Sequence, residues 1–538
     1  MRKKHFLFAS VLALLCGSSA LHAQDFKLTS SGYFKNQGVD IMAFDDIYPE
    51  GHQGGVCIIM NGHRVATNGD IRLEATPGQW QPVPKQLDRK LGENSITATL
   101  CYPDSSRHLT GFNPMIYPDL HLIYTVNVES KGKNIEVTVD LDRPIPQEFI
   151  GKVGFNLEFF PGSLFGKPWI MDGQSGIFPQ QPNSPLMTTQ PNYLHTGNYH
   201  DGKQSLADMD KLIGKGYSPI VADDIISEPY AKGRKFTSRP DDPYNKVTIE
   251  SLSGDLQLFD GRMNHNNGWF VLRSNIKPGV TKGAVKWIIT PNVVADWMYQ
   301  PVIQTSQIGY HPAQDKEAVI EMDIRDNRKE TAQIIRIDAD GEKVVKNVTP
   351  ANWGKFLRYN YLKVDFTDVK EPGLYKIKYD TSVSPIFRID NDVYARGVWQ
   401  PVLEYFLPVQ MCHMRVNEKY RVWHDCCHMD DAQMAPAHNH IDGYDQKEGL
   451  SKFKPGEVVP GVNIGGWHDA GDFDLRIESQ AGESYILALA YEAFHPNLDV
   501  TSIDQINRVT EIHQPDGKND LLQQVENGAL TVVTGYLA

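Results

Sequence analysis

Two carboxylates in a glycine-rich stretch are the side chains of this sequence best placed for acid–base chemistry. Asp469 and Asp472 lie three positions apart within Gly465–Asp472. Glycines permit tight turns and a close approach of ligand to backbone, so a turn here can direct both carboxylates into one site. Paired carboxylates suit general-base catalysis, in which one side chain holds a water and the other orients it. Trp467 offers an aromatic face that can stack on a sugar ring. For the carboxylate pair, spacing alone gives a calcium-binding or solvated acidic turn the same weight as a catalytic site.

Cysteines and histidines gather upstream of that stretch. The segment 412–428 contains Cys412, Cys426 and Cys427 together with His413, His424 and His428. Thiolate and imidazole groups are the ligands that zinc prefers in a four-coordinate site. Six cysteines occur in all, and one of them lies in the first 23 residues, so an odd number remains and a simple disulfide framework is disfavoured. Metal binding is the favoured interpretation, with a reduced or disulfide-paired cysteine cluster as the alternative.

Composition bounds the class of protein. The chain has 538 residues with 41% hydrophobic and 22% charged residues, values that are ordinary for folded globular chains. At roughly 100–200 residues per domain we expect about three domains. The net charge is -13, and no basic patch is dense enough for a phosphate backbone, so nucleic acid is not an expected partner. An acidic balance also suits a neutral ligand such as a sugar polymer.

The N-terminus has the pattern of a secretory signal. Residues 1–23 combine a basic start, an apolar core and small residues near a cleavage position. We therefore predict an exported protein, periplasmic or extracellular. Lipid attachment at Cys16 is the less favoured alternative, because Leu15 is bulky for the usual recognition sequence. No later run reaches the ~20 apolar residues of a membrane helix, so no transmembrane segment is expected.

Two β regions precede a helical one. Residues 24–300 contain short alternating runs, among them a hairpin over 124–141, and favour a large antiparallel β-sandwich. Residues 303–390 contain further short strands at a spacing typical of an immunoglobulin-like β-sandwich. Helices are expected over 394–411, 480–494 and 520–538. The last of these carries a broad apolar face up to the final residue, so we expect the domain formed by 391–538 to be incomplete.

The carboxylate motif carries a family resemblance. The segment 465–474, GGWHDAGDFD, resembles the DAGD motif of glycoside hydrolase family nine, the inverting endoglucanases and related enzymes. Three further segments resemble that family in the same order, namely 304–312, 373–379 and 516–522. The resemblance covers about 303–538, while 24–300 resembles more weakly an extra β-rich region of some Bacteroidetes-type members. It implies that 391–538 is the N-terminal part of an all-α (α/α)6 barrel.

The resemblance also implies an activity. Asp472 matches the base that activates the attacking water, and Asp469 matches the assisting carboxylate. The implied reaction is inverting hydrolysis of β-1,4-glucosidic bonds in a cellulose-like or xyloglucan-like polysaccharide. The family's general acid is a Glu several hundred residues after the motif, and this chain ends about 66 residues after Asp472. Glu478 and Glu483 lie in a helix that the family uses structurally, so an inactive fragment that keeps folded β domains and glycan binding is the alternative.

A metal-ligand set follows from the same resemblance. Cys412 and the pair Cys427-His428 match cysteine segments of the family, and members with those cysteines tend to carry His before the first motif aspartate, as His468 does here. The resemblance implies a structural zinc site formed by Cys412, Cys427, His428 and His468, which would brace loops beside the active site. His440 competes for the fourth position. Calcium is a second candidate cation, for which Asp430 and Asp431 offer carboxylates.

Overall fold

The structure is a computed structural model of the chain. It describes residues 25–45, 54–74, 76–78, 84–102, 121–184, 227–263, 268–429, 432–434, 452–469 and 475–538. The predicted signal with Cys16, the carboxylates Asp430 and Asp431, the competing ligand His440 and the predicted base Asp472 lie outside these residues. The chain divides into two compact units, one formed by residues 1–299 with 441–443 and the other by residues 300–440 with 444–538.

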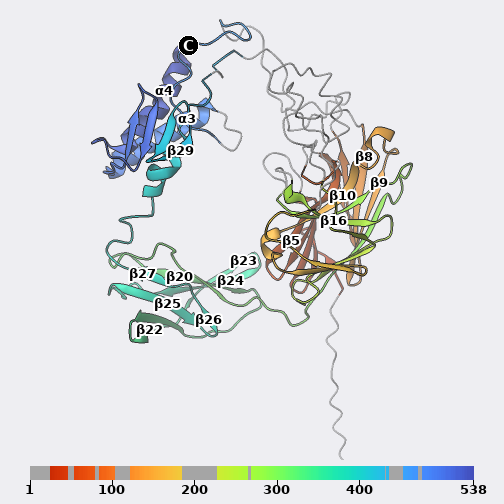
Figure 1. Ribbon diagram of the computed structural model, residues 1–538. Helices are drawn as coiled ribbons and strands as arrows, with labels where there is room; N and C mark the ends of the chain where they lie inside the picture. Colours follow the sequence, from red (N-terminus) through yellow and green to blue (C-terminus); the bar gives the residue numbers. More distant parts are fainter. Residues whose placement is uncertain are drawn as a thin grey trace, which may run out of the picture. The chain divides into compact units, whose positions relative to one another are not determined.

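The first unit contains a large antiparallel β-sandwich (Figure 1), which confirms the prediction for this region. One nine-stranded sheet runs in the order β1 (Lys27–Leu28), β2 (Phe34–Asn36), β3 (Val39–Ala43), β4 (Val56–Met60), β5 (His63–Leu73), β10 (Val153–Phe159), β17 (Phe270–Asn275), β16 (Leu256–Asp260) and β13 (Ala231–Gly233). The other runs in the order β12 (Gln174–Ile177), β11 (Pro168–Met171), β14 (Lys235–Ser238), β15 (Val247–Ser251), β18 (Val285–Pro291), β9 (Asn134–Leu141), β8 (Ile123–Lys131), β7 (Ser95–Cys101) and β6 (Lys85–Leu91).

Side-chain alternation builds this sandwich. In the predicted hairpin of β8 and β9, every second residue is buried, and Val126 pairs with Val139 across the ladder. Strand side chains point alternately to the two faces, so one set of each strand enters the space between the sheets. There they meet large side chains such as Phe155 and Trp287, whose rings pack edge to face at a centroid distance of 4.9 Å. The hydrophobic pattern thus fixes both the hairpin register and the core.

The second unit begins with a smaller sandwich. Its first sheet has the order β19 (Val302–Gln304), β20 (Glu317–Asp323), β24 (Tyr359–Asp365) and β23 (Ala351–Phe356). Its second sheet has the order β22 (Gly341–Val348), β21 (Ala332–Asp338), β25 (Gly373–Tyr379) and β26 (Ser382–Val383), with β27 (Phe387–Ile389) also paired to β25. A core that includes Ile320, Ile334 and Tyr375 lies between them. The short strands expected over 303–390 are present, in two sheets that face each other across this core.

The remaining segment mixes helices with a sheet. A turn of π-helix (Val402–Phe406) continues into α2 (Leu407–Gln410), and α3 (Ile477–Phe494) packs against α4 (Asp520–Leu537). The two long helices confirm the prediction, whereas the helix expected over 394–411 is correct only for its second half. The purely helical expectation was wrong in one respect: β29 (Arg421–His424), β28 (Arg415–Glu418), β31 (Val509–Ile512) and β30 (Thr501–Asp504) form a four-stranded sheet. The α-barrel stays a prediction.

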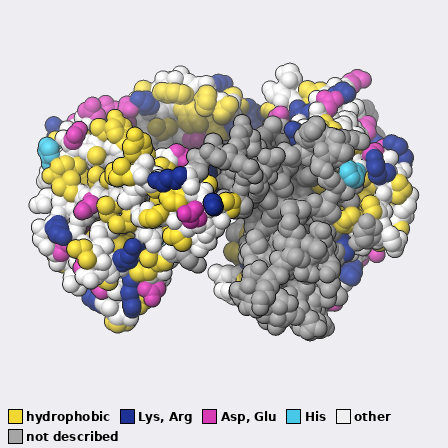
Figure 2. Space-filling view, turned by 90° about the horizontal axis from the view of Figure 1, so that it is seen from above, with side chains coloured by type: hydrophobic (Ala, Val, Ile, Leu, Met, Phe, Trp, Pro, Cys, Tyr) yellow, Lys and Arg dark blue, Asp and Glu magenta, His cyan; other side chains and the backbone are white. Residues whose placement is uncertain are grey.

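The two long helices bury mainly polar side chains and expose several apolar ones. The buried residues of α4 are mostly polar, and Gln480 is the buried residue of α3. Apolar side chains such as Phe494 (80% exposed) and Tyr536 (87% exposed) lie on the surface instead. Hydrophobic side chains also lie in patches among charged ones on the face of the molecule seen in Figure 2. Among the described residues, no helix combines the length and apolar character needed to cross a membrane.

Candidate active site and metal centre

The loop that leads into the carboxylate motif is pressed against α4. Gly465 and Gly466 have φ angles of 68° and 82°, a conformation that other residues adopt at a cost. A Cβ atom at Gly465 would overlap the backbone carbonyl oxygen of Asn527, and one at Gly466 would lie 2.9 Å from the hydroxyl of Thr531. Both glycines are therefore required by the backbone conformation and by the close approach to the helix.

Trp467 is part of the protein interior. Its side chain is 2% exposed and belongs to a core cluster that includes Met411 and Leu521. The indole N–H donates to Oε1 of Gln524 over 2.8 Å. A buried indole with its polar atom paired has no face left for a ligand. The burial of Trp467 contradicts the predicted sugar contact, and we interpret this side chain as the anchor of the loop.

Polar side chains of α3 and α4 hold the backbone of the same loop. Gln480 binds Trp467 twice, because its Oε1 accepts from the Trp467 N–H (2.8 Å) and its Nε2 donates to the Trp467 carbonyl oxygen (2.9 Å). Asn527 Nδ2 donates to the carbonyl oxygen of Gly466 (3.0 Å), and the Thr531 hydroxyl donates to that of Ile464 (2.6 Å). The loop backbone thus bonds to two helices immediately before the first motif carboxylate.

Asp469 is the motif carboxylate that the structure describes. Its side chain is 30% exposed, and its Oδ2 lies 3.5 Å from Nε of Arg476. On α3, partial desolvation and then the charge of Asp469 raise the pKa of Glu483. A carboxylate in this position is open to a ligand and influences a second carboxyl group.

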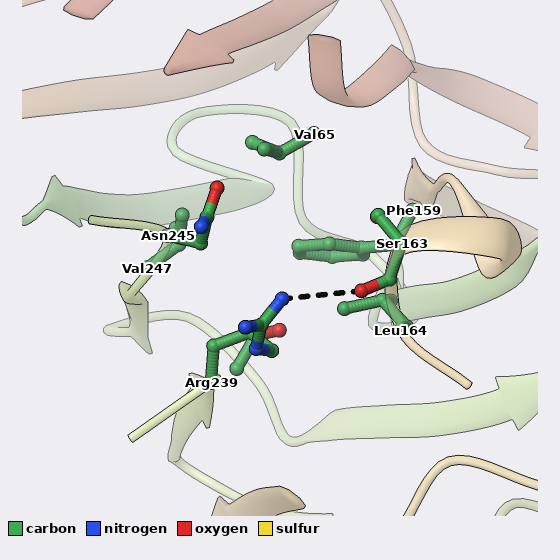
Figure 3. A pocket seen from close by; sticks show the side chains of 8 residues that line it. Val65, Phe159, Ser163, Leu164, Arg239, Asn245 and Val247 are labelled. Atoms are coloured by element: carbon green, nitrogen blue, oxygen red, sulfur yellow. Dashed lines mark hydrogen bonds between the residues drawn. The ribbon is translucent and has the colours of Figure 1, made fainter. Parts of the chain in front are cut away.

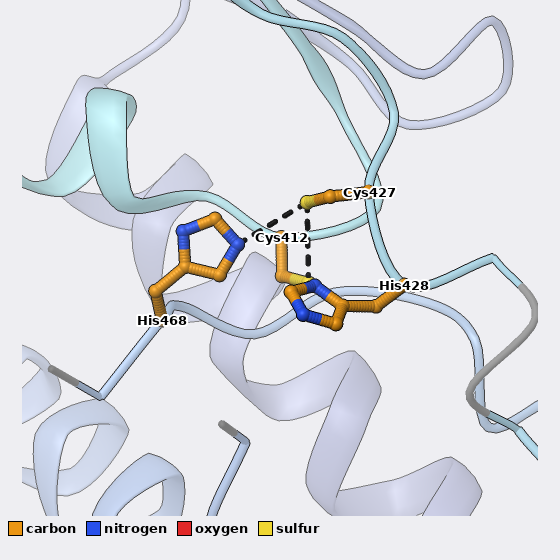
Figure 4. Close-up of side chains that lie close together, drawn as sticks. All are labelled: Cys412, Cys427, His428 and His468. Atoms are coloured by element: carbon orange, nitrogen blue, oxygen red, sulfur yellow. Dashed lines mark hydrogen bonds between the residues drawn. The ribbon is translucent and has the colours of Figure 1, made fainter. Parts of the chain in front are cut away.

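The predicted ligand set comes together in space (Figure 4). The ligand atoms of Cys412, Cys427, His428 and His468 all lie within 4.8 Å of one another. The Cys412 and Cys427 sulfurs are 3.6 Å apart, Cys412 Sγ is 3.0 Å from Nδ1 of His428, and Cys427 Sγ is 3.1 Å from Nε2 of His468. The bond from Cys412, and then those from His424 and His468, hold the pKa of the Cys427 thiol well below its usual range.

These four side chains fit a tetrahedral metal. With Zn–S and Zn–N distances of about 2.3 and 2.0–2.1 Å, two ligand atoms on one tetrahedral zinc lie about 3.4–3.8 Å apart. The observed separations need only small side-chain shifts to reach that range. Two thiolates and two imidazoles are also the ligand types that zinc prefers and that calcium, which takes oxygen ligands, does not. The donor set therefore favours a closed site for a thiophilic metal.

Backbone pairing brings the ligands together. The Cys412 N–H donates to the Gly466 carbonyl oxygen (2.9 Å), and the His468 N–H donates to the Gln410 carbonyl oxygen (2.8 Å). These two bonds flank an antiparallel bridge between Met411 and Trp467. Because the pairing is antiparallel, Cys412 lies opposite Gly466 and His468 lies opposite Gln410, so the two ligands flank the bridge on the same face of the paired segments.

One pocket in the described part of the first unit is too small for a sugar. It is lined by Val65, Phe159, Ser163, Leu164, Ser238, Arg239, Asn245 and Val247 (Figure 3). Its open volume holds about one water molecule. Arg239 Nη1 donates to the Ser163 carbonyl oxygen across it (3.1 Å). We interpret the pocket as a packing gap between loops.

The sequence did not reveal the side chains that hold the loop. Gln480, Gln524, Asn527 and Thr531 carry no catalytic pattern, and hydrophobic periodicity places them on solvent-facing positions. The available signal was the pair Gly465-Gly466, which indicated a close approach of something to the backbone. That partner is the protein itself.

Comparisons with known proteins give one family match. Residues 298–384 match the family model described as the cellulase N-terminal ig-like domain. A search of curated proteins found no match.

Solved structures of glycoside hydrolase family 9 are similar to parts of the chain. A metagenome-derived family 9 endoglucanase has 24% identity and a TM-score of 0.33, covering 44% of this chain and 40% of its own. A Zn-binding triple mutant of a family 9 endoglucanase has 23% identity and a TM-score of 0.31 (42% and 38%). A family 9 protein of Bacteroides ovatus has 21% identity and a TM-score of 0.31 (42% and 37%).

The chain spans about two fifths of the length of these solved structures, and at such TM-scores the likeness transfers neither a fold nor an activity. The family model is specific where it applies, and the observed sandwich agrees with it. Residues 298–384 are therefore an immunoglobulin-like domain of the kind found at the N-terminus of cellulases.

Proposed function

We propose that this protein is an exported glycoside hydrolase that cleaves β-1,4-glucosidic bonds of a cellulose-like or xyloglucan-like polysaccharide with inversion. The observation that carries the proposal is the position of Asp469. This open carboxylate directly follows a loop that is fixed by buried hydrogen bonds and borders a metal-type cluster. A cellulase-type immunoglobulin-like domain precedes the segment that bears it. Residues 1–23 would direct export.

The two motif carboxylates have different roles in this proposal. Asp472 takes a proton from the attacking water, and Asp469 orients that water. Inversion requires a protonated carboxyl group ~6.5–9.5 Å from the base, so that a water fits between base and sugar. We assign that acid to no residue of this chain. Nε of Arg476 lies 3.5 Å from Oδ2 of Asp469, and this ion pair helps to orient the carboxylate.

We further propose that the Cys/His cluster holds zinc. Cys412, Cys427, His428 and His468 would be the ligands, and a zinc with four protein ligands supplies cross-linking of loops and no water activation. The cluster joins the segment after β29 to the motif loop, because His468 is the residue before Asp469. In this proposal the metal keeps the two segments together while substrate binds at the carboxylates.

A reducing-sugar assay with the purified chain tests the hydrolase proposal. The substrates are carboxymethylcellulose, mixed-linkage glucan and xyloglucan, and the variants are Asp472→Asn and Asp469→Asn. Turnover by the unchanged chain would place the acid within it; we expect such turnover to be lost in Asp472→Asn and to fall by about 10²–10⁴-fold in Asp469→Asn, the usual range for loss of an acid–base group. Asp255→Asn in the first unit serves as the control. Retained turnover in Asp472→Asn refutes the assigned base.

Metal analysis of the purified chain tests the zinc proposal. We expect one zinc per chain, lost in Cys427→Ser and retained in Cys426→Ser, because the exposed Cys426 lies outside the ligand set. Equal zinc content in the two variants contradicts the assigned ligands.

A further inference from the structure

The side chains that hold the motif loop form a complete buried network. Gln480, Gln524, Asn527 and Thr531, together called the amide clamp, are at most 5% exposed. A buried amide without partners costs about 1–3 kcal/mol in proteins, so such residues persist only where their polar atoms are paired. Here they are paired: Asn527 Oδ1 accepts from Gln505 (2.9 Å), and Gln524 Nε2 points to Met411 Sδ (3.5 Å).

The clamp acts on backbone rather than on other side chains. Four of its bonds end on main-chain atoms of Ile464, Gly466 and Trp467. The backbone N–H of Gly466 also donates to the Asn527 carbonyl oxygen over 3.1 Å. Main-chain atoms of this loop are therefore positioned from two helices, independently of the side chains that the loop presents.

The clamp is connected to both proposed functional groups. The Gly466 carbonyl oxygen accepts from Asn527 Nδ2 and also from the N–H of Cys412, a proposed metal ligand. Gln480 binds both the N–H and the carbonyl oxygen of Trp467, and the next two residues are His468 and Asp469. Any movement of Trp467 would therefore displace a metal ligand and a carboxylate together.

We propose that the amide clamp is the positioning device of this site, setting the separation of Cys412 and His468 and the direction of Asp469. This inference rests on the proposed function for its catalytic part, whereas its metal part can be tested without turnover. Because amides and hydroxyls are neutral, the clamp fixes the loop without adding a charge beside the carboxylates or the thiolates. Gln480 is its central member, since its side chain binds both the N–H and the carbonyl oxygen of Trp467.

A matched pair of threonines gives the sharpest test. Thr531 donates to the loop, whereas Thr534 on the next part of α4 donates only to carbonyl oxygens of its own helix, Leu530 and Thr531. Thr531→Val and Thr534→Val remove the same hydroxyl with the same change of shape. Gln480→Met is the stronger variant, because it removes both bonds to Trp467 at similar volume.

Zinc affinity and amide exchange are the two readouts. Zinc dissociation constants are measured on the full chain by competition with a chromophoric chelator. Outer-shell changes usually weaken a metal site by about 10–100-fold. We expect about 10-fold weaker zinc binding in Gln480→Met, a smaller loss in Thr531→Val and none in Thr534→Val. In the metal-free chain, hydrogen exchange of the Trp467 amide should be at least ~10-fold faster in Gln480→Met, since its acceptor is lost.

The outcomes separate the two proposals. If the clamp variants match Thr534→Val in zinc affinity and amide exchange, the inference is overturned even when the unchanged chain hydrolyses glucan. If the unchanged chain shows no turnover, the proposed function fails while the clamp is still judged by zinc and exchange. With turnover, we expect kcat to fall in Gln480→Met at unchanged KM. Should Gln480→Met fail to fold, the threonine pair decides alone.

Discussion

Two of the buried polar networks among the described residues differ in charge. In the large sandwich, Glu74 after β5 accepts from Arg273 on β17 (3.2 Å) and from Asn156 on β10 (2.6 Å), and the two charged side chains are 2% and 1% exposed. Nearby, Asp70 accepts from the Tyr124 hydroxyl (2.9 Å). The amide clamp of the second unit, in contrast, consists of neutral groups. Both networks pair their polar atoms, yet only the first holds charges away from water.

This difference has consequences for how each network responds to its surroundings. Burial outweighs the attraction of Arg273 and raises the pKa of Glu74 to about 7, and burial likewise raises that of Asp70 to about 6. The sandwich network therefore changes protonation within the ordinary pH range. The amide clamp has no group that titrates there. The clamp therefore holds the loop before Asp469 through groups whose protonation does not change in this range.

Removal of one partner of the buried ion pair should give the largest effect. Arg273→Met leaves Glu74 without its cation, and breaking a buried pair on one side costs about 3–5 kcal/mol. The buried cysteines Cys57 and Cys101 report on this unit, because their thiols react with 4,4′-dithiodipyridine only when the sandwich opens. We expect their labelling midpoint in urea to fall sharply. Arg143→Met, which removes the exposed ion pair with Asp142, should change the free energy of unfolding by at most ~1 kcal/mol and so leave the midpoint nearly unchanged.

The pH dependence of the sandwich should be the next largest effect. Glu74 binds its proton more tightly in the folded state, with a pKa of about 7, than its ordinary value of 4.5. The folded state is thus favoured at low pH, and stability falls as the pH rises from about 4.5 to about 7, by an amount of order 3 kcal/mol. Arg72 and Arg273 oppose this shift and Glu158 adds to it.

The same thiol labelling checks this prediction at pH 5, 6 and 7. We expect the urea midpoint to fall across this series in the unchanged chain and to become nearly flat in Glu74→Gln. Asp70→Asn should remove a smaller part of the pH dependence of the midpoint, below pH 6, since the pKa of Asp70 is raised to about 6 and that of Glu74 to about 7. A slope that survives both substitutions would assign the pH dependence to other groups.

The sequence predicted the elements whose patterns are local. The hairpin over 124–141 alternates in period two, and α4 begins at Asp520 after the N-cap residue Asn519, whose Oδ1 accepts from the N–H groups of Leu521 and Leu522. The four-stranded sheet escaped prediction for a physical reason. Its strands have four residues each, and β28 pairs in parallel with β31 from far along the chain. Such pairing leaves almost no local periodicity.

The site was predictable in its ligands and not in its support. Thiol and imidazole side chains indicate metal binding by residue type alone. The four side chains implied by the family resemblance do lie close together in the structure. The role of Trp467 was wrong because an aromatic residue beside the motif carboxylates suits either a ligand contact or a core position. The amide clamp was missed since hydrophobic periodicity assigns glutamine and asparagine to the surface, whereas on α4 the polar face is the buried one.

The smallest predicted effect separates two glycines of α4. Alanine in place of glycine usually stabilises a helix by about 0.5–1 kcal/mol. At Gly528, however, a Cβ atom would overlap the Ser484 hydroxyl and the Trp467 ring, whereas at Gly535 its nearest neighbour is Cδ1 of Ile477 at 3.5 Å. We expect Gly535→Ala to slow hydrogen exchange over 520–537, and Gly528→Ala to accelerate it, since overpacking costs about 1–3 kcal/mol.

This pair of variants also tests what the amide clamp requires. If α4 touched the loop only through polar side chains, a methyl group at Gly528 would be tolerated, and both variants would stabilise the helix equally. Close contact between the helix backbone and the Trp467 ring predicts opposite signs. Gly528→Ala should additionally weaken zinc binding, because the displaced ring is attached to the peptide that precedes His468, while Gly535→Ala should leave zinc affinity unchanged. Opposite signs in exchange with equal zinc affinity would confine the clamp to stability and remove its role in positioning the metal.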